Sequence, residues 1–479
     1  MVVGEVAEGV DLLVVGGGPG GYSAALRAAQ LGRSVMLVDR LGEAGVGGVC
    51  LQVGCIPSKA MIEVAEAKHR TTSLREAGLQ VEQAQVDLAQ FQTWKDAKVA
   101  GLTSAVLGLL RRAQVEVVAG DFRFTRPGSG VVQSLDDRPP RHVQYTDVIL
   151  ATGSRPLELP GLPRDGVGVL DSTDALALAR LPASVAVVGG GYIGLELGTA
   201  LAKLGSRVTI VEALDRLLPG VDAALLRPVR QRLKALGVDV LLEHRVQSFE
   251  DGRLTATSQG QAVELAVEQV VVAIGRMPNT DGLGLHKIGL TPGPTGLIEV
   301  GKDRLAAPHV AAIGDITAGP ALAHKATAEA EVAAEALCGL PVAFDPATIP
   351  AVVFSDPEIA IAGLSPDEAK AQGITVAVGR LPLGASGRAA TMDATDGFTQ
   401  VVVDRTTDAV VGVQIVGPHA SELIAEGVLA IEMAASPQDL VGSIHPHPTL
   451  SEMLPDAARG LLHRPAGATV PTAAFVGVP

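Results

Sequence analysis

A glycine-rich pattern occurs twice in this chain of 479 residues, and no other feature constrains its fold as strongly. The first copy follows a short apolar run that ends at Val15, and the second follows one that ends at Val188. In each copy, three glycines spaced as G-x-G-x-x-G precede a helix-like stretch and a second apolar run that ends in an acidic residue. The matching positions are Gly16, Gly18, Gly21 and Asp39 in the first copy and Gly189, Gly191, Gly194 and Glu212 in the second. Two strand–helix–strand units with the same internal spacing predict an α/β protein with two domains built around parallel strands.

The glycines and the acidic residue of each copy have separate physical roles in binding a dinucleotide. Glycines let the backbone turn tightly and approach a pyrophosphate, and the start of the next helix offers free N–H groups to that anion. The acidic side chain, Asp39 or Glu212, would accept a hydrogen bond from a ribose hydroxyl. Because a carboxylate repels a 2′-phosphate, Glu212 favours NAD over NADP at the second site. The plainer alternative is two helix-packing turns without a ligand.

Length, composition and charge narrow the class of protein further. The chain is too long for one core and suggests about three domains. Its 47% hydrophobic and 19% charged residues are typical of a globular protein. A net charge of −14 argues against nucleic-acid binding, since phosphate neutralisation needs a basic face. The apolar runs are short and rich in glycine, and residues 1–10 show no leader pattern, so we expect a cytoplasmic protein without a membrane segment.

Two of the three cysteines, Cys50 and Cys55, lie close together just after the first glycine pattern. Such a pair can close a small ring and exchange two electrons as a dithiol/disulfide couple. Two buried free cysteines are the plainer alternative. In a reducing compartment, however, a close pair is more typical of catalysis than of a structural staple. A redox pair beside the first glycine pattern predicts tightly bound FAD there and exchanging NAD at the second pattern.

Several further runs occur in a fixed order along nearly the whole chain. They are GPGGYSAALRAAQLG at 18–32, GCIPSK at 54–59, ATGS at 151–154, AIGR at 273–276, IGD at 313–315, LAHKA at 322–326 and HPHPTLSE at 445–452. Together they resemble the pyridine nucleotide–disulfide oxidoreductases, and within that family the dihydrolipoamide dehydrogenases. No single run is specific, but the ordered set is.

The resemblance implies two Rossmann-like dinucleotide-binding domains, for FAD and NAD, and a C-terminal α+β interface domain that forms a homodimer. The implied boundaries are an FAD domain at 1–150, an NAD domain at 151–280, a central segment returning to FAD at 281–346 and an interface domain at 347–479. The proline-rich stretch 341–357 favours a boundary in this region.

The resemblance also implies roles at the reaction centre. Cys50 would meet the substrate and Cys55 the flavin. A helix is expected to begin at Cys55, and a helix N-terminus lowers the pKa of a thiol, which suits a thiolate beside oxidised flavin. Lys59, one turn later, would reach the flavin and pair with Glu196. Solvated helix positions are the plainer alternatives for both residues.

His447 is the candidate base, and the resemblance implies that the other subunit supplies it. Glu452 would orient it, because a carboxylate on one imidazole nitrogen fixes the tautomer and raises basicity. His445 is expected to have a local structural role. No metal site is expected, since no Cys or His cluster has zinc spacing.

The remaining candidate residues are expected to contact the cofactors. They are Gly120, Ser154 and Asp315 for FAD, and Tyr192, Val246 and Gly275 for NAD. A plain turn role is the alternative for Gly120 and Ser154.

The implied activity oxidises protein-bound dihydrolipoamide to lipoamide and passes two electrons through a Cys50–Cys55 disulfide and FAD to NAD⁺. The implied partners are the lipoyl domain and the subunit-binding domain of an acyltransferase, or the glycine cleavage system; the sequence does not indicate which complex. Glu212 disfavours a glutathione reductase-like enzyme, and a mercuric reductase-like enzyme would need cysteines after Cys338. A non-catalytic flavoprotein scaffold or sensor is disfavoured by the complete set of reactive residues.

Overall fold

The computed structural model describes residues 8–136 and 138–462. Residues 1–7, for which no leader pattern is expected, and the C-terminal residues 463–479 lie outside the described residues. The described chain forms two compact units, each made of two stretches of sequence. The first unit holds the described residues up to Pro182 and Gln269–Asp345, and the second holds Ala183–Glu268 and the described residues from Pro346 onward. The predicted boundaries at 150, 280 and 346 divide the chain more finely and stay predictions.

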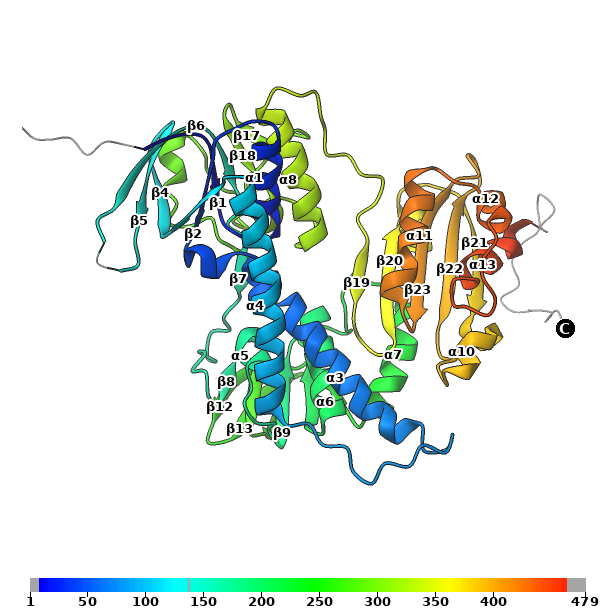
Figure 1. Cartoon of the computed structure of the whole chain (residues 1–479). Helices are drawn as coiled ribbons and strands as arrows, with labels where there is room; N and C mark the ends of the chain where they lie inside the picture. Colours follow the sequence, from blue (N-terminus) through cyan, green and yellow to red (C-terminus); the bar gives the residue numbers. More distant parts are fainter. Residues whose placement is uncertain (1–7, 137, 463–479) are drawn as a thin grey trace, which may run out of the picture. The chain divides into compact units, whose positions relative to one another are not determined.

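The first unit is built around one large sheet (Figure 1). Its helices are α1 (Pro19–Gln30), α2 (Gly48–Gln52), α3 (Cys55–Ser73), α4 (Leu88–Arg112), α5 (Ser172–Leu176) and α8 (Ala323–Leu337). Its strands are β1 (Glu8–Val15), β2 (Val35–Asp39), β3 (Glu116–Ala119), β4 (Asp121–Arg126), β5 (Ser129–Gln133), β6 (Arg141–Leu150), β7 (Ser154–Pro156), β8 (Val169–Leu170), β15 (Gln269–Val272), β16 (Arg276–Pro278), β17 (Leu305–Ala307) and β18 (Val310–Ala312). The main sheet has the order β17-β18-β6-β1-β2-β3, and β4 and β5 extend it from β6.

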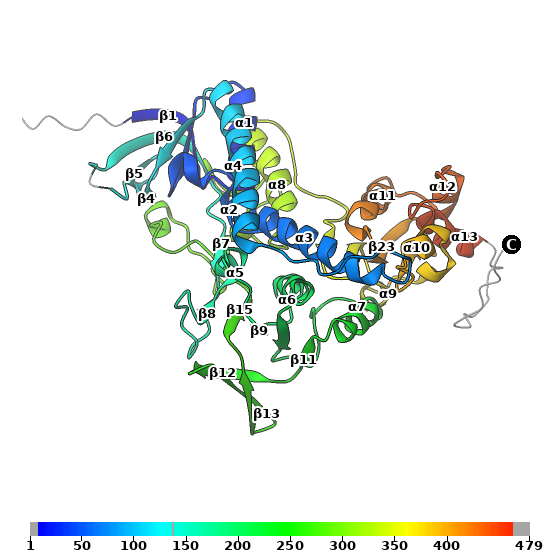
Figure 2. The ribbon, with the colours of Figure 1, turned by 60° about the horizontal axis from the view of Figure 1, so that its bottom comes forward.

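The central strands of this sheet are parallel, as the first glycine pattern predicts. β1 pairs with β2 on one side and with β6 on the other, and β18 pairs with β6. Because side chains alternate along a strand, Leu12 and Val14 of β1 face one layer while Leu13 and Val15 face the other. Alanines of α1 and α8 cover the first face, and their small side chains let the two helices lie side by side (Figure 2).

The second unit contains the second glycine pattern and the C-terminal sheet. Its helices are α6 (Tyr192–Leu204), α7 (Ala223–Ala235), α9 (Pro366–Ala371), α10 (Gly387–Thr391), α11 (Ala420–Glu432), α12 (Pro437–Gly442) and α13 (Met453–Leu462). Its strands are β9 (Ser184–Val188), β10 (Arg207–Val211), β11 (Asp239–Leu241), β12 (Arg245–Glu250), β13 (Arg253–Ser258), β14 (Gln261–Ala266), β19 (Ala351–Val353), β20 (Glu358–Gly363), β21 (Val376–Pro382), β22 (Phe398–Asp404) and β23 (Val410–Gly417). β9, β10 and β11 are parallel, which matches the predicted second strand–helix–strand unit.

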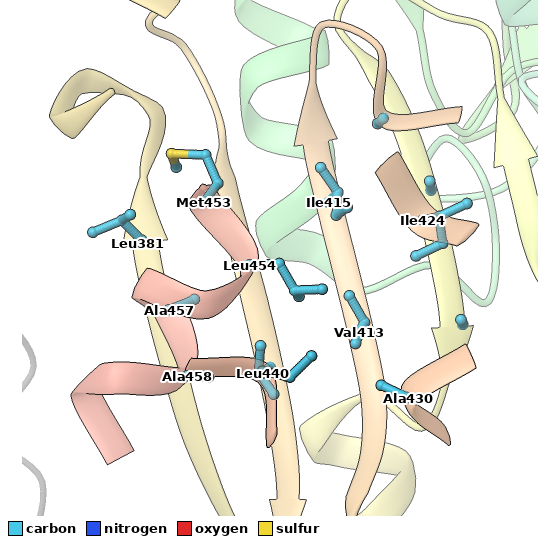
Figure 3. Close-up of a cluster of buried hydrophobic side chains, with 14 of the residues drawn as sticks. Leu381, Val413, Ile415, Ile424, Ala430, Leu440, Met453, Leu454, Ala457 and Ala458 are labelled. Atoms are coloured by element: carbon cyan, nitrogen blue, oxygen red, sulfur yellow. The ribbon is translucent and has the colours of Figure 1, made fainter. Parts of the chain in front are cut away.

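The C-terminal part of the second unit is α+β, as expected. Five antiparallel strands have the order β19-β20-β23-β22-β21. Helix α11 packs on β20 and β23, and α13 packs on β21 and β22. Between the sheet and these helices lies an aliphatic core that includes Ile415, Ile424 and Leu454 (Figure 3).

One helical stretch among the described residues, Gly48–Ser73, is long and apolar enough to cross a membrane by its length and composition. A helix within a water-soluble domain can pass the same test. This stretch comprises α2 and α3, carries Lys59 and Glu63, and packs against α4 inside the first unit. We therefore interpret it as part of that unit and not as a membrane segment.

Candidate active site

The first glycine turn has the geometry of a dinucleotide cradle. Gly16 has a φ of +110°, and a Cβ on Gly21 would lie only 1.7 Å from the Gly16 carbonyl oxygen, so the turn admits only glycine at both places. The Asp39 carboxylate accepts a hydrogen bond from the Gly17 N–H at 2.9 Å, which fixes it at the end of β2. No side chain caps α1 at Gly18, so the first N–H groups of the helix can donate to a pyrophosphate. These residues fit the adenine dinucleotide part of FAD.

The second glycine turn repeats this geometry. Gly189 has a φ of +111°, and a Cβ on Gly194 would lie 2.0 Å from the Gly189 carbonyl oxygen. The buried Glu212 carboxylate accepts a hydrogen bond from the Gly190 N–H at 2.6 Å. A Cβ on Gly191 would meet no atom of the described residues within 4 Å, and no side chain caps α6 there. The residues fit a second dinucleotide, with open space where its phosphates would approach.

The other predicted nucleotide contacts lie in different parts of the fold. Tyr192 begins α6 and is 42% exposed. Val246 lies in β12, which follows directly after His244, whose N–H donates to the Glu212 carbonyl at 2.9 Å. Gly275 belongs to the first unit, where it follows β15 with a φ of +134°. Contact of these three residues with NAD stays a prediction.

Two predicted flavin contacts come together in the first unit. The Ser154 hydroxyl donates to the Asp315 carboxylate at 2.5 Å, although the two residues are far apart in sequence. Arg276, to which the sequence analysis assigns no role, donates to the Ser154 hydroxyl at 2.8 Å. Gly120, with a φ of +146°, donates its N–H to the Asp39 carbonyl at 3.0 Å. Ser154 therefore contacts a second expected flavin contact, Asp315, and Gly120 contacts Asp39 of the first glycine pattern.

The cysteine pair begins directly at the first glycine turn. The Gly47 N–H donates to the Gly17 carbonyl at 2.8 Å, and a Cβ on Gly48 would lie 2.6 Å from the Gly18 Cα. This contact places the start of the cysteine helices against the turn that would hold the flavin. From the sequence, the cysteines are expected near the first glycine turn only because they follow it in the chain. The structure shows that the two segments are in direct contact.

Cys50 lies half-buried in α2, and Cys55 is the exposed first residue of α3; both are thiols in this structure. A hydrogen bond to the Cys55 sulfur, burial and the charge on Cys55 raise the pKa of the Cys50 thiol, and Lys59 offsets this only in part. Burial, chiefly, raises the pKa of the Tyr22 phenol on α1, which lies near Cys50 and is a neighbour that the sequence does not predict.

Lys59 and Glu196 have surroundings that differ from solvated helix positions. Lys59 is half-buried one turn after Cys55. Glu196 on α6 is 4% exposed, and its carboxylate accepts a hydrogen bond from the Phe354 N–H at 3.0 Å. The structure thus gives Glu196 a partner that the sequence analysis does not predict, while its pairing with Lys59 stays a prediction.

The predicted histidine–carboxylate pair is formed. His447 Nδ1 lies 2.9 Å from a Glu452 carboxylate oxygen, and the other oxygen accepts a hydrogen bond from the Thr449 N–H at 2.8 Å. That N–H, and then His447, hold the pKa of the Glu452 carboxyl below its usual range. The His447 side chain is 80% exposed, so its Nε2 is available to a substrate or a second subunit. His445 instead contacts Glu426 at 2.9 Å, in agreement with a local role.

Among residues 8–136 and 138–462, no group of three or more His, Cys, Asp or Glu side chains could hold a metal ion.

Comparison with known proteins gives consistent matches along nearly the whole chain. Residues 10–330 match the pyridine nucleotide-disulphide oxidoreductase family, and residues 349–458 match the dimerisation domain of the same family. A dihydrolipoyl dehydrogenase of Halobacterium salinarum is 46% identical over 471 residues, which cover 96% of this chain and 98% of the relative. One of Geobacillus stearothermophilus is 44% identical over 470 residues, covering 97% of this chain and 99% of the relative.

Solved structures of similar fold include LpdA from Mycobacterium tuberculosis, with a TM-score of 0.86, 28% identity and coverage of 94% of this chain and all of that one. The HOCl-induced flavoprotein disulfide reductase RclA from Escherichia coli has a TM-score of 0.83 and 26% identity, with coverage of 94% of this chain and 99% of that one.

Proposed function

Since the chain belongs to the pyridine nucleotide-disulphide oxidoreductases, we propose that it oxidises dihydrolipoamide carried by a partner protein and reduces NAD⁺. It is an NAD-dependent oxidoreductase with FAD as its flavin. The observation that carries the proposal is the contact between the cysteine segment and the first glycine turn, which places a dithiol beside the flavin site. High identity to two dihydrolipoyl dehydrogenases over their full length supports the choice of substrate.

The two cysteines have different parts in the reaction. Starting from the disulfide, a substrate thiolate attacks the Cys50 sulfur, the S–S bond breaks, and the electron pair stays on Cys55. The second substrate thiol then attacks the mixed disulfide, which releases oxidised lipoamide and leaves Cys50 as a thiol. The raised pKa of the Cys50 thiol agrees with this division, since the second charge of the pair is disfavoured. Bound FAD supplies the step that moves the two electrons on to NAD⁺.

His447 holds the proton that the substrate thiol loses. Its Nδ1 is engaged by Glu452, so Nε2 is the atom that accepts the proton and later returns it. We propose that the second copy of a homodimer supplies this histidine, as the match to the family's dimerisation domain supports.

The proposed partners follow from the substrate. A lipoyl group carried on another protein would be presented by the lipoyl domain of an acyltransferase, whose subunit-binding domain would hold the dimer, or by the glycine cleavage system. We place the reaction in the cytoplasm. Glu212 supports NAD against the NADPH of glutathione reductase-like enzymes, because a carboxylate after this strand would repel a 2′-phosphate, and the Gly190 N–H holds the Glu212 carboxylate beside the second glycine turn.

The test replaces one sulfur at a time. Cys50→Ser is expected to abolish dihydrolipoamide-dependent NAD⁺ reduction while the purified protein keeps its flavin absorbance. Cys338→Ser is the matched control, because Cys338 lies at the end of α8 and has no part in the cycle, and it should keep full turnover. Normal turnover by the Cys50 variant would refute the mechanism.

A second variant tests the base. His447→Ala is expected to lower the rate by about 10²–10⁴-fold, the usual contribution of general-base catalysis. The neighbouring His445→Ala is the control for local disturbance, and it should retain most of the activity. A His447 variant with the activity and pH profile of the wild type would remove His447 from the mechanism.

A further inference from the structure

Two fully buried charged side chains contact Gly314, the residue before the predicted flavin contact Asp315. Glu329 and Lys325 belong to α8 and are 0% and 2% exposed, and the mostly buried Arg304, just before β17, contacts Glu329. Lys325 lies in the LAHKA motif at 322–326, from which no role for its side chain is expected. Charged side chains are almost never buried without a partner, so this group needs an explanation.

Every polar atom of the two α8 side chains has a partner. The Lys325 ammonium donates to the Gly314 carbonyl at 3.0 Å and the Thr317 hydroxyl at 3.1 Å, and lies 3.2 Å from Glu329 Oε2. Glu329 Oε1 accepts from Arg304 at 2.9 Å, and Oε2 accepts from the Gly314 N–H at 2.7 Å. Because the charged groups of Lys325 and Glu329 are both paired, movement of either side chain would leave a buried charge unpaired. Arg304 is less completely bound, since its buried Nε has no hydrogen-bond partner among the described residues.

The network holds one residue from both sides. Gly314 has its N–H bound by Glu329 and its carbonyl bound by Lys325, with the Thr317 hydroxyl adding a bond to the same carbonyl at 2.9 Å. Gly314 has a φ of +76°, which glycine adopts without strain but a residue with a side chain rarely does. Asp315 follows directly, and its carboxylate is held by Ser154.

We propose that Lys325 and Glu329 are positioning residues that fix the Gly314 turn and thereby direct Asp315 at the flavin. The inference rests on the proposed function only in taking the first glycine turn as the FAD site. It makes the affinity for FAD depend on side chains that do not belong to either glycine pattern. This role of Lys325 and Glu329 differs from packing alone, because their effect on FAD binding passes through one group, the Asp315 carboxylate.

The test measures FAD binding to reconstituted apoprotein by quenching of flavin fluorescence. Lys325→Met removes the ammonium and keeps the aliphatic stem, and it should raise the Kd for FAD about tenfold, the loss expected for a hydrogen bond from a charged group. Glu335→Gln is the matched control. It breaks the Glu335–Arg27 pair elsewhere on α8, which does not touch Gly314, and should leave the Kd unchanged.

A double-mutant cycle separates positioning from stability. In an Asp315→Ala background the positioned carboxylate is gone, so Lys325→Met should have little further effect on the Kd. Thr317→Val provides a milder disturbance of the same turn if Lys325→Met does not fold, and it should show the same dependence on Asp315. An unchanged Kd in either folded variant, or an equal effect with and without Asp315, would overturn the proposal. Because the readout is FAD binding, its outcome is independent of whether dihydrolipoamide is the substrate.

Discussion

The two glycine turns are nearly identical in themselves and differ in what surrounds them. Their first glycines have φ values of +110° and +111°, and the added Cβ atoms would lie 1.7 Å and 2.0 Å from the facing carbonyl oxygens. In each turn, the residue after the first glycine of the pattern donates its N–H to the acidic side chain: Gly17 to Asp39 at 2.9 Å and Gly190 to Glu212 at 2.6 Å. The local sequence therefore builds the same device twice.

The surroundings separate the two sites. At the middle glycine of each pattern, a Cβ on Gly18 would lie 3.9 Å from the Gly48 Cα of the cysteine segment, whereas one on Gly191 would meet nothing within 4 Å among the described residues. The first turn also contacts a distant segment, since a Cβ on Gly20 would lie 3.1 Å from Ile313, while the close contact at Gly190 of the second turn is with Leu217 at 2.5 Å. An enclosed site suits a flavin that stays bound through the cycle, and an open one suits a nucleotide that exchanges.

The largest expected effect comes from filling the first turn. Gly21→Ala puts a methyl group into the Gly16 carbonyl, so the turn must open and the purified protein should contain almost no flavin. The ratio of flavin to protein absorbance measures this. Gly9→Ala, in β1 where a Cβ meets nothing within 4 Å, is the control and should keep its flavin. A full complement of flavin in the Gly21 variant would show that the first glycine turn does not hold the flavin.

Filling the second turn should remove only the second half of the reaction. Gly194→Ala has the matching clash with the Gly189 carbonyl, so NADH formation should be lost while dihydrolipoamide still reduces the protein by two electrons under anaerobic conditions, seen as a long-wavelength absorbance band. Gly198→Ala on the same helix makes ordinary contacts of 3.5 Å or more and should behave as wild type. Equal loss of flavin in both glycine variants would show that the sites are not separate.

The helices that follow the two turns differ in the burial of the ion pairs that link them to other elements, and a third variant tests this difference. Helix α1 is linked to α8 by a partly exposed pair, Arg27–Glu335, whereas Lys203 on α6 is buried against Asp356 at 2.7 Å, with Arg232 also on that carboxylate. Asp356→Asn removes the negative charge that faces Lys203 and Arg232 in this buried pair and should cost about 3 kcal/mol of stability. Urea denaturation measures it, with Glu335→Gln as the exposed control, for which we expect a loss of at most about 1 kcal/mol.

The pH dependence has a definite sign. Burial favours the neutral acid, but Lys203 and then Arg232 outweigh it, so the pKa of the Asp356 carboxyl is lowered. The stabilisation is therefore fully present above the unfolded pKa of about 4 and is lost as the pH falls through the lowered folded value. The difference between wild type and Asp356→Asn should shrink below pH ~4; a difference that stays constant down to acid pH would contradict this origin.

The smallest expected effect concerns the choice of nucleotide. Glu212→Ala removes the carboxylate that repels a 2′-phosphate and should narrow the preference for NAD over NADP by about tenfold, equal to ~1.4 kcal/mol. The ratio of kcat/KM for the two nucleotides measures it. Asp215→Ala, at an exposed acid just beyond, is the control for general charge. A ratio that does not move would assign Glu212 a structural role alone.

The fold and the cofactor turns could be predicted because their signals are local. The spacing of Gly16, Gly21 and Asp39 depends on one strand, one turn and one helix, and the second copy repeats it. The bond from Arg276 to Ser154, the network at Gly314 and the contact of Glu196 with Phe354 join residues distant in sequence. No periodicity records such pairs, so only the folded chain identifies them.

The most direct test of the account mixes the oxidised wild-type protein with dihydrolipoamide in a rapid-scanning spectrophotometer and then adds NAD⁺. We predict a long-wavelength absorbance band when two electrons have entered, from the Cys55 thiolate beside oxidised flavin, and its decay as NADH forms. The band should be absent in Cys55→Ser. Formation of NADH at the normal rate without the band, or with both sulfurs alkylated, would show that electrons do not pass through the cysteine pair.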